Sequence, residues 1–431
     1  MVLVVLFVLL FAAIFLTIPI GISLGGATLI SMISFTKMSP DVLAQLAVTG
    51  LDSFTLLAIP YFILAGELMS TGGISRRIVN MAHCFVKNLA GALAIITTCA
   101  CMFFAAISGS GPATVSAIGS MMIPEMEKDH YDKAWATAIT CCGGIIGVII
   151  PPSIPFVLFG VITGCSIGEL FIAGIVPGLL IGAALCVYSW WVCKKNGYGE
   201  RLENEEHREQ MSLWDTFKDS FAALLTPLII LGGIYAGIFT PTEAAIVANV
   251  WALIAGRFIY KELDWHTLIT ALKNTALTTS SCLFTIACAT GFGYLLTTMQ
   301  VPAKFAAFLL GATSNTYLII LMLLIFLLII GCFMDNITSM TILTPIFVPI
   351  VQQCGYSLVH FGVFMTVALA IGFITPPYGA NLFVASGITG LTVPQISKKI
   401  LPMIILLIVL LMIITFIPGI SMGLPGLIYN K

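Results

Sequence analysis

A cluster of hydroxyl, glycine and proline residues stands inside an apolar stretch, in the segment Ser108-Gly109-Ser110-Gly111-Pro112. Hydroxyl and carbonyl oxygens are the ligands that hard cations prefer. Flexible glycines beside a proline favour a hairpin tip that presents such oxygens. The segment lacks the lysine of a phosphate-binding loop. It predicts a cation site at a hairpin tip, and a small-residue face that packs against another helix is an equal alternative.

Two further segments predict helices that unwind inside a membrane. Ile150-Pro151-Pro152-Ser153-Ile154-Pro155 follows Gly147, and Thr375-Pro376-Pro377 leads to Asn381. Proline has no N–H and keeps the preceding residue out of the helical region, so upstream carbonyl groups are freed to bind a cation. A helix–loop–helix turn at the membrane edge is the alternative. The apolar Phe156-Val157-Leu158-Phe159 that follows favours a break within the membrane.

An acidic residue is embedded in the second half of the chain, in Met334-Asp335-Asn336 with Thr338 close behind. Long apolar runs flank it, and an acid at membrane depth is a functional candidate by default. Asp335 is therefore predicted to be a cation ligand, a proton carrier or the partner of a substrate cation. The alternative is that it caps the start of a helix.

The composition places these motifs in a membrane protein. The 431 residues are 59% hydrophobic and 9% charged, with a mean hydropathy of +1.09, whereas soluble domains are roughly a quarter charged. This excludes a soluble enzyme, a disordered protein and a nucleic-acid binder. The twelve cysteines lack the spacing of a zinc site or a disulfide framework and are predicted to be packing residues.

Apolar stretches need about 20 residues to cross a bilayer as a helix. We predict spans near 2–22, 89–107, 134–150, 170–193, 222–239, 241–258, 275–298, 315–332, 360–374 and 400–419. Shorter or interrupted stretches lie near 24–35, 53–70, 108–124, 151–166, 336–350 and 376–390. Irregular backbone at membrane depth is tolerated only where protein buries it or where it lines a cavity. The predicted fold is therefore an all-α polytopic membrane protein whose interrupted stretches carry the function.

The chain repeats itself on either side of a charged connector, residues 194–221. Pro151-Pro152 recurs 225 residues later as Pro376-Pro377. At the same offset Gly66, Pro124, Gly147 and Pro177 match Gly291, Pro349, Gly372 and Pro402. We predict a first repeat over 1–193, with a hairpin near 108–124 and an unwound helix over 147–155. The second repeat covers 222–431, with a hairpin near 331–350 and an unwound helix over 372–381.

The basic residues predict that the two repeats have inverted topology. The positions that correspond to Lys128 and Lys133 in the second repeat, 225 residues later, are uncharged. The positions that correspond to Lys398-Lys399 in the first repeat are Ala173-Gly174. Because basic residues concentrate in cytoplasmic loops, the basic ends swap sides between the repeats. We therefore expect a cytoplasmic connector and periplasmic termini.

Several segments resemble the large membrane (M) subunit of tripartite ATP-independent periplasmic (TRAP) transporters of the C4-dicarboxylate and sialic-acid type. They are Leu57-Ala58-Ile59-Pro60-Tyr61-Phe62-Ile63-Leu64-Ala65-Gly66-Glu67-Leu68-Met69, Ala105-Ala106-Ile107-Ser108-Gly109-Ser110, Ile149-Ile150-Pro151-Pro152-Ser153-Ile154-Pro155, Pro241-Thr242-Glu243-Ala244-Ala245 and Thr375-Pro376-Pro377. The resemblance runs from about Pro19 to Pro425, nearly the whole chain, and the motifs are specific when taken together.

The resemblance implies two inverted repeats with re-entrant hairpins and unwound helices, as in elevator transporters of the ion-transporter superfamily. It implies a Na⁺-driven importer of organic acids in a bacterial inner membrane, which is not an enzyme and has no organic cofactor. The implied partners are a separate small four-helix membrane subunit (Q type), a periplasmic substrate-binding protein (P type), the carboxylate substrate and the bilayer.

The resemblance also implies two or more cotransported Na⁺ ions and assigns their ligands. The first site is expected at Ser108, Ser110, Gly147, Ile150 and Pro152. The second site is expected at Gly331, Asp335, Gly372 and Thr375. Substrate contacts are expected at Gly109, Ser153, Asn336, Thr338 and Asn381.

Two other classes of function fit the sequence less well. An ion channel needs a continuous polar lining, and the charge-poor helices do not predict one. An integral-membrane enzyme needs a reactive cluster such as paired acids or closely spaced histidines, and the sequence offers neither. The substrate stays open among sialic acid, C4-dicarboxylates and other carboxylates.

Overall fold

The computed structural model describes residues 2–16, 18–36, 38–85, 91–198, 213–313, 315–377 and 379–429. Within these ranges the chain forms helices and no β-strand, which confirms the predicted all-α fold. The middle of the predicted connector, residues 199–212, and the position after the second Pro-Pro pair, Tyr378, lie outside the described residues.

The first half runs up to the connector. It contains α1 (Val2–Phe15), α2 (Ile20–Phe35), α3 (Pro40–Leu51), η1 (Phe54–Leu57), α4 (Ala58–Thr71), α5 (Ile74–Phe85), α6 (Ala92–Ser108), α7 (Gly111–Lys128), α8 (Lys133–Ile145), η2 (Ile146–Val148), α9 (Ile154–Thr163) and α10 (Ile167–Asn196). The predicted hairpin is the α6–α7 pair, and the predicted unwound segment lies between α8 and α9.

The second half begins with α11 at Leu213, so both flanking helices extend into the predicted connector 194–221. It contains α11 (Leu213–Tyr235), α12 (Pro241–Ile254), η4 (Ala255–Ile259), α13 (Trp265–Thr298), α14 (Val301–Ala312), α15 (Thr316–Gly331), α16 (Asn336–Gln353), α17 (Leu358–Gly372), α18 (Ala380–Thr389), α19 (Val393–Phe416) and α20 (Gly419–Tyr429). Here the hairpin is α15–α16, and the interrupted helix is α17–α18. Both Pro-Pro pairs, Pro151-Pro152 and Pro376-Pro377, contain a cis peptide bond.

The two halves pack against each other through exchanged elements. Hairpin helix α7 packs on α18 of the second half, and hairpin helix α16 packs on α9 of the first half. In the same way, α8 packs on α19, and α17 packs on α10. Each contact has a counterpart in which the roles of the two halves are reversed.

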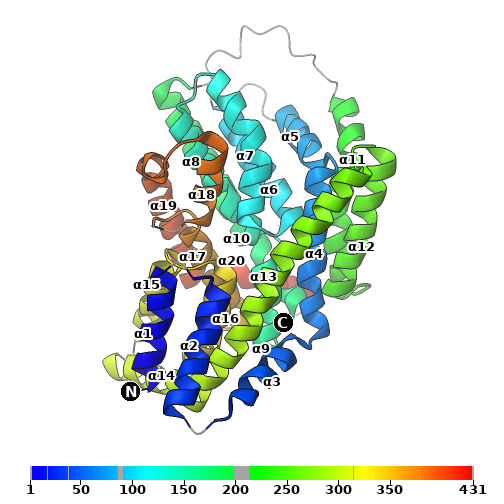
Figure 1. Cartoon of the computed structure of the whole chain (residues 1–431). Coiled ribbons are helices and arrows are strands. Elements are labelled where there is room, and N and C mark those ends of the chain that lie inside the picture. Colours follow the sequence, from blue (N-terminus) through cyan, green and yellow to red (C-terminus); the bar gives the residue numbers. More distant parts are fainter. Residues whose placement is uncertain are drawn as a thin grey trace.

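The longest described helix, α13, spans 34 residues and crosses the front of the molecule obliquely (Figure 1). It packs against α2, α3 and α4 and also reaches the hairpin helix α16. Helices α4, α5, α11 and α12 form one side of the molecule, and α8, α18 and α19 lie on the other (Figure 1). The hairpin tips lie between these two sides.

Six helical stretches of the described chain are long and apolar enough to cross a membrane. They are Phe54–Thr71, Ile167–Asn196, Trp214–Tyr235, Pro241–Ile259, Trp265–Thr298 and Val393–Phe416. Two predictions were wrong. The stretch 53–70 is one continuous helical run, because Pro60 sits in the first turn of α4, where a missing N–H costs little. The predicted span 2–22 is split before Pro19, whose extended backbone (φ −51°, ψ 136°) separates α1 from α2.

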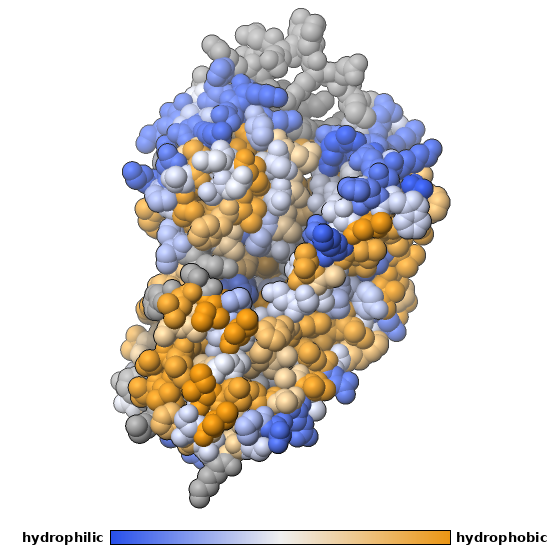
Figure 2. Space-filling view, in the orientation of Figure 1, coloured by the Kyte–Doolittle hydropathy of each residue, from blue (hydrophilic) through white to orange (hydrophobic). Residues whose placement is uncertain are grey.

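Hydrophilic side chains gather at the end of the molecule from which the connector leaves, and apolar side chains cover much of the rest apart from a few hydrophilic ones at the opposite end (Figure 2). At that end Arg77 pairs with Asp219 and Glu262 at 3.1 and 2.8 Å, and its guanidinium lies 3.7 Å from the ring centre of Tyr260. Lys194 and Lys195 lie over Trp190 and Trp191 at the end of α10. Aromatic residues beside cations are typical of a membrane–water interface.

Candidate functional site

The first hairpin tip gathers three oxygen atoms within hydrogen-bonding distance. Ser108 ends α6, and its Oγ lies 3.1 Å from Thr114 Oγ1 and 3.4 Å from the Ser110 carbonyl oxygen. Thr114 donates its hydroxyl to the same Ser110 carbonyl at 2.7 Å. The turn between them depends on Gly109, whose φ of 61° favours glycine. Ser110 then caps α7 by accepting the Ala113 N–H.

The interrupted helix of the first half packs directly against the backbone of this tip. A Cβ added to Gly147 would lie 2.5 Å from Thr114 Oγ1 and 2.6 Å from the Ser110 carbonyl oxygen. A Cβ on Gly109 would lie 2.8 Å from the Pro152 carbonyl oxygen. The structure therefore brings together Ser108, Ser110, Gly147 and Pro152 of the predicted first site.

Proline chemistry explains the break at this position. Because residue 151 is proline, the Gly147 carbonyl loses the N–H that a continuous helix would supply. The Val148 carbonyl lacks a helical donor because residue 152 is also proline. The buried Ser153 hydroxyl donates to this carbonyl instead, at 2.6 Å. Ser153 also accepts the Phe156 N–H and starts α9. Its observed partners are thus backbone groups of the break, although a substrate contact was predicted. Ile150 turns its side chain toward Gly178 of α10.

Asn381 of the second half reaches into the first site. Its side-chain Nδ2 donates to the Cys141 carbonyl at 3.1 Å, and its Oδ1 would lie 3.2 Å from a Cβ on Gly111. The residue is fully buried, and Oδ1 has no hydrogen-bond partner among the described residues. The hairpin tip of one half and the interrupted helix of the other therefore share one buried region.

The second hairpin tip places a carboxylate where the first has a serine. Asp335 caps α16 and accepts the Thr338 N–H at 3.2 Å and the Thr338 hydroxyl. Asp335 therefore fills the alternative role of a helix cap, and its role as a cation ligand stays a prediction. A cap does not use up a carboxylate, because its two oxygens have about four acceptor positions. The hydrogen bonds to Thr338 hold the carboxylate at the tip, available to a further ligand.

The interrupted helix of the second half also touches its own hairpin. A Cβ on Gly372 would overlap the Gly331 carbonyl, and it would lie 2.6 Å from the Gly331 Cα atom. Thr375 donates to the Ile371 carbonyl at 2.8 Å, and its side chain lies close to the Cys332 thiol, which donates to the Leu328 carbonyl. Gly331, Gly372 and Thr375 therefore lie together. Asp335 directs its hydrogen bonds to Thr338, so within the described residues it is not hydrogen-bonded to Gly372 or Thr375.

The two tips differ in how their polar groups are satisfied. Asn336 is 1% exposed, and neither atom of its amide has a hydrogen-bond partner in the described part of the chain. The Ser339 hydroxyl, fully buried one turn later, is in the same state. Buried polar groups without partners are rare and costly. A bound water or polar ligand could satisfy these groups at the second tip.

Two residues at the tips were not among the predicted ligands. Thr114 is fully buried and joins Ser108, Ser110 and Gly147, and Ser339 stands at its position in the second half, 225 residues later. The offset that relates the Pro-Pro pairs could have found this pair of hydroxyls. Among the described residues, no group of three or more His, Cys, Asp and Glu side chains is arranged to hold a metal ion.

Comparison with known proteins places this geometry in a family. Residues 7–420 match the model of the tripartite ATP-independent periplasmic transporter, DctM component. The isethionate TRAP transporter permease protein DctMQ of Oleidesulfovibrio alaskensis is 46% identical over 410 residues, 95% of this chain and 64% of that protein. This chain therefore spans less than two thirds of that relative.

Other relatives are matched over nearly their full length. The C4-dicarboxylate TRAP transporter large permease protein DctM of Pseudomonas aeruginosa is 40% identical over 94% of both chains. The sialic acid TRAP transporter large permease protein SiaM of Vibrio cholerae is 36% identical over 95% of both chains.

A solved structure shares the fold. The crystal structure of the Alcanivorax borkumensis YdaH transporter aligns with a TM-score of 0.63, at 15% sequence identity, over 90% of this chain and 91% of that one. The family and its named relatives are transporter permeases and not enzymes. The chain belongs to the DctM-component family of tripartite ATP-independent periplasmic transporters.

Proposed function

We propose that this chain is the large membrane subunit of a Na⁺-coupled importer of organic acids that works by an elevator mechanism. One observation carries the proposal: two hairpin tips meet two interrupted helices, and oxygen atoms gather at both tips. Oxygen ligands suit a hard cation. Each cation that moves down 100 mV supplies about 2.3 kcal/mol, so cotransported ions can drive accumulation without ATP.

The first tip supplies neutral ligands to one cation. Ser108 Oγ, Thr114 Oγ1 and the Ser110 carbonyl point to one another, and the Gly147 carbonyl has lost its helical donor to Pro151. A site built only from hydroxyl and carbonyl oxygens suits a monovalent ion better than a divalent ion, which prefers carboxylates.

The second tip supplies one negative charge. Asp335, held by Thr338, is the ligand that would balance a second cation, with Gly331, Gly372 and Thr375 lining the approach. The unpartnered amide of Asn336 offers two N–H donors beside it, and donors are what an organic anion needs. Cation and anion would thus bind as neighbours and neutralise each other.

The reciprocal packing of the halves supports inverted repeats that move as one carrier. Lys399, at the start of α19, pairs with Asp132, at the start of α8, at 3.0 Å. In the first half the loop before α8 therefore lies at the same end as the loop before α19 of the second half. The repeat offset relates α8 to α17 and α10 to α19. Two loops that do not correspond in the repeats therefore lie on the same side of the membrane, as expected when one repeat is inverted.

The charge distribution sets the orientation that we propose. Arg76, Arg77, Lys194 and Lys195 lie at the connector end, which we assign to the cytoplasm by the positive-inside rule. The N-terminus is drawn at the opposite end (Figure 1), and α19 runs 24 residues away from the connector end before α20 begins. Both termini would then be periplasmic.

The names of the relatives suggest partners and substrates. The name of the DctMQ relative joins M and Q, and we propose that a small four-helix membrane subunit of the Q type works with this chain. A periplasmic binding protein would deliver the substrate. Isethionate, C4-dicarboxylates and sialic acid are the organic acids named for the relatives, and all present an anionic head to the tips.

The test is uptake by proteoliposomes that contain this chain, a small membrane subunit and a binding protein. We expect uptake of at least one of these acids, driven by an inward Na⁺ gradient and abolished when K⁺ replaces Na⁺. Transport that is independent of the gradient would contradict the proposal, and unitary currents would indicate a channel. The variant Thr270→Val, which removes an exposed hydroxyl bonded to the His266 carbonyl within α13, serves to show that a polar change elsewhere leaves the Na⁺ requirement intact.

A further inference from the structure

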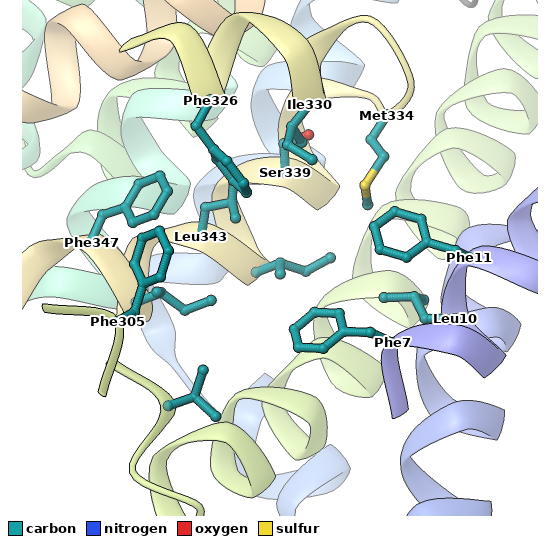
Figure 3. A pocket seen from close by; sticks show the side chains of 13 residues that line it. Phe7, Leu10, Phe11, Phe305, Phe326, Ile330, Met334, Ser339, Leu343 and Phe347 are labelled. Carbon is teal, nitrogen blue, oxygen red and sulfur yellow. The ribbon is translucent and has the colours of Figure 1, made fainter. Parts of the chain in front are cut away.

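An apolar cavity of about 360 Å³ lies between the N-terminal helix and the second hairpin. Phe7, Leu10 and Phe11 of α1 face Leu343 of α16 and Phe326 of α15 across it (Figure 3). Ligand pockets in proteins begin at about 300 Å³. The Ser339 hydroxyl is the one side-chain hydroxyl in the lining, and the other lining side chains are apolar.

The cavity opens to the apolar outer surface. Phe11 and Phe326 both line it, and they are 40% and 36% exposed. Val8, Ile325 and Ile329, on the same two helices, are exposed by 50% or more. Figure 2 shows this apolar surface in the lower part of the molecule, where α1 and α15 lie. In a chain that spans a membrane, such a surface faces lipid.

A cation stands beside the cavity. Helix α14 lines it through Val301 and Phe305, and Phe305 stacks on Phe347 with ring centres 6.1 Å apart. Lys304 lies between Val301 and Phe305 in the sequence and is exposed. Its ammonium group donates a hydrogen bond to the Met299 carbonyl at 3.0 Å. It is the only Lys or Arg between Asn274 and Ser397. An ammonium at the membrane surface attracts phosphate groups.

We propose that this cavity binds one acyl chain of a bilayer phospholipid whose phosphate lies at Lys304. The chain fills a space between α1 and the α15–α16 hairpin that carries Asp335. It therefore acts as a wedge between the N-terminal helix and an ion-binding tip, and the hairpin cannot approach α1 while the chain is bound. The cavity shares Ser339 with the second tip, but none of the proposed Na⁺ ligands Gly331, Asp335, Gly372 and Thr375 lines it.

The experiment uses a phospholipid with a photoreactive diazirine in the middle of its acyl chain, added to the purified full-length protein in detergent. After illumination, mass spectrometry of peptides should locate the label on α1 and on α15–α16. Unlabelled phospholipid should compete and reduce this labelling at least fivefold. Labelling that spreads over all apolar faces, or that does not saturate, would overturn the proposal without any variant.

Variants sharpen the test. Leu343→Trp fills the cavity and should reduce labelling of α1 at least fivefold, whereas Ile325→Trp, 50% exposed on α15 and outside the lining, should leave it unchanged. Equal labelling of both folded variants would contradict the site. For the head group, phosphatidylglycerol should compete better than a diacylglycerol with the same chains, and Lys304→Gln should remove that difference. Equal competition in the unmodified protein would refute the role of Lys304.

Discussion

The two hairpin tips share a backbone design and differ in chemistry. In each, a helix ends, a short turn follows, and a capping side chain starts the next helix: Ser110 in the first half and Asp335 in the second. The first tip is neutral, and its hydroxyls bond to one another. The second carries a carboxyl group, and among the described residues the side chains of Asn336 and Ser339 have no hydrogen-bond partner.

This difference predicts that the first tip is stable without a ligand and that the second tip depends more on one. A tip that satisfies its own polar groups holds its geometry before any ligand arrives, which favours a preformed site for one cation. A tip with buried groups left unpartnered is less stable alone and gains more when a ligand binds. We therefore expect ligand binding to stabilise the second tip more than the first.

The largest effect is expected from a methyl group inserted where the backbones of Gly331 and Gly372 touch at the second tip. Gly372→Ala places a methyl group against the Gly331 backbone, which no side-chain rotation relieves. Overpacking of this kind costs about 1–3 kcal/mol. We expect a clear fall in melting temperature and loss of uptake, larger than for Gly147→Ala, whose methyl meets the Thr114 hydroxyl as well as backbone. Gly387→Ala, in a helix with open space around it, is the control and should be neutral.

The second prediction distinguishes a helix cap from an ion ligand. Asn caps helices about as well as Asp, so Asp335→Asn should leave the melting temperature unchanged. Loss of a charged ligand worth about 2–3 kcal/mol should weaken Na⁺ binding roughly 30- to 150-fold. The measurement is the Na⁺ concentration for half-maximal uptake.

Asp264→Asn is the matched control for this change. Asp264 caps α13 and accepts the Thr267 N–H at 2.7 Å, which reproduces the Asp335–Thr338 arrangement outside the membrane. It should change neither stability nor Na⁺ dependence. If Asp335→Asn behaves like Asp264→Asn, the carboxylate is a cap and the asymmetry between the tips has no role in transport.

The third prediction addresses the neutral tip. Thr114→Val keeps the shape of the side chain and removes a hydroxyl worth about 1 kcal/mol, so Na⁺ affinity should fall roughly fivefold. The double variant Ser108→Ala with Ser110→Ala should give a similar or larger loss. Thr137→Val, which removes a buried hydroxyl bonded to the Lys133 carbonyl, is the control. An unchanged Na⁺ affinity in the tip variants would remove the first site.

The smallest effect is expected where the halves meet at the connector end. Asp132 and Lys399 are 34% and 44% exposed, so Lys399→Gln should cost at most about 1 kcal/mol. Burial raises the pKa of Asp132, but the Trp135 N–H and the Lys399 ammonium lower it by more, and the net direction is downward.

That direction fixes the pH dependence. A carboxyl group whose pKa is lowered by folding stabilises the protein above its unfolded pKa, about 3.9. This contribution is lost as the pH falls through the folded pKa. The difference in melting temperature between the unmodified protein and Lys399→Gln should therefore be present at neutral pH and vanish in acid. Lys398→Gln should show no such difference, and a difference that persists in acid would contradict the ion pair.

The sequence was sufficient where local chemistry decides the backbone. The prolines at 151, 152, 376 and 377 predicted both interruptions to within a few residues, and Ser110 and Asp335 lie at the predicted turns. Prediction failed at 53–70 because Pro60 has a different effect in the first turn of a helix than in its middle.

Contacts between distant segments could not be read from local patterns. Nothing near Asn381 in the sequence indicates Cys141, and the packing of α16 on α9 depends on the whole arrangement of helices. Thr114 is not among the predicted ligands, and a threonine in an apolar helix usually bonds its own backbone, as Thr114 does with the Ser110 carbonyl. Its contact with Ser108 depends on the turn that brings the two side chains together.

The hydrogen bond between Asn381 and Cys141 also constrains the order in which the protein assembles during synthesis. A nascent chain emerges from its N-terminus, so the first hairpin enters the bilayer while residue 381 is still to be synthesised. Until α18 arrives, α7 lacks the surface on which it packs, and the Cys141 carbonyl lacks its donor. The surroundings of the first hairpin tip are thus completed only near the end of translation, and a chain that stops before residue 381 lacks both the donor to Cys141 and the packing surface for α7.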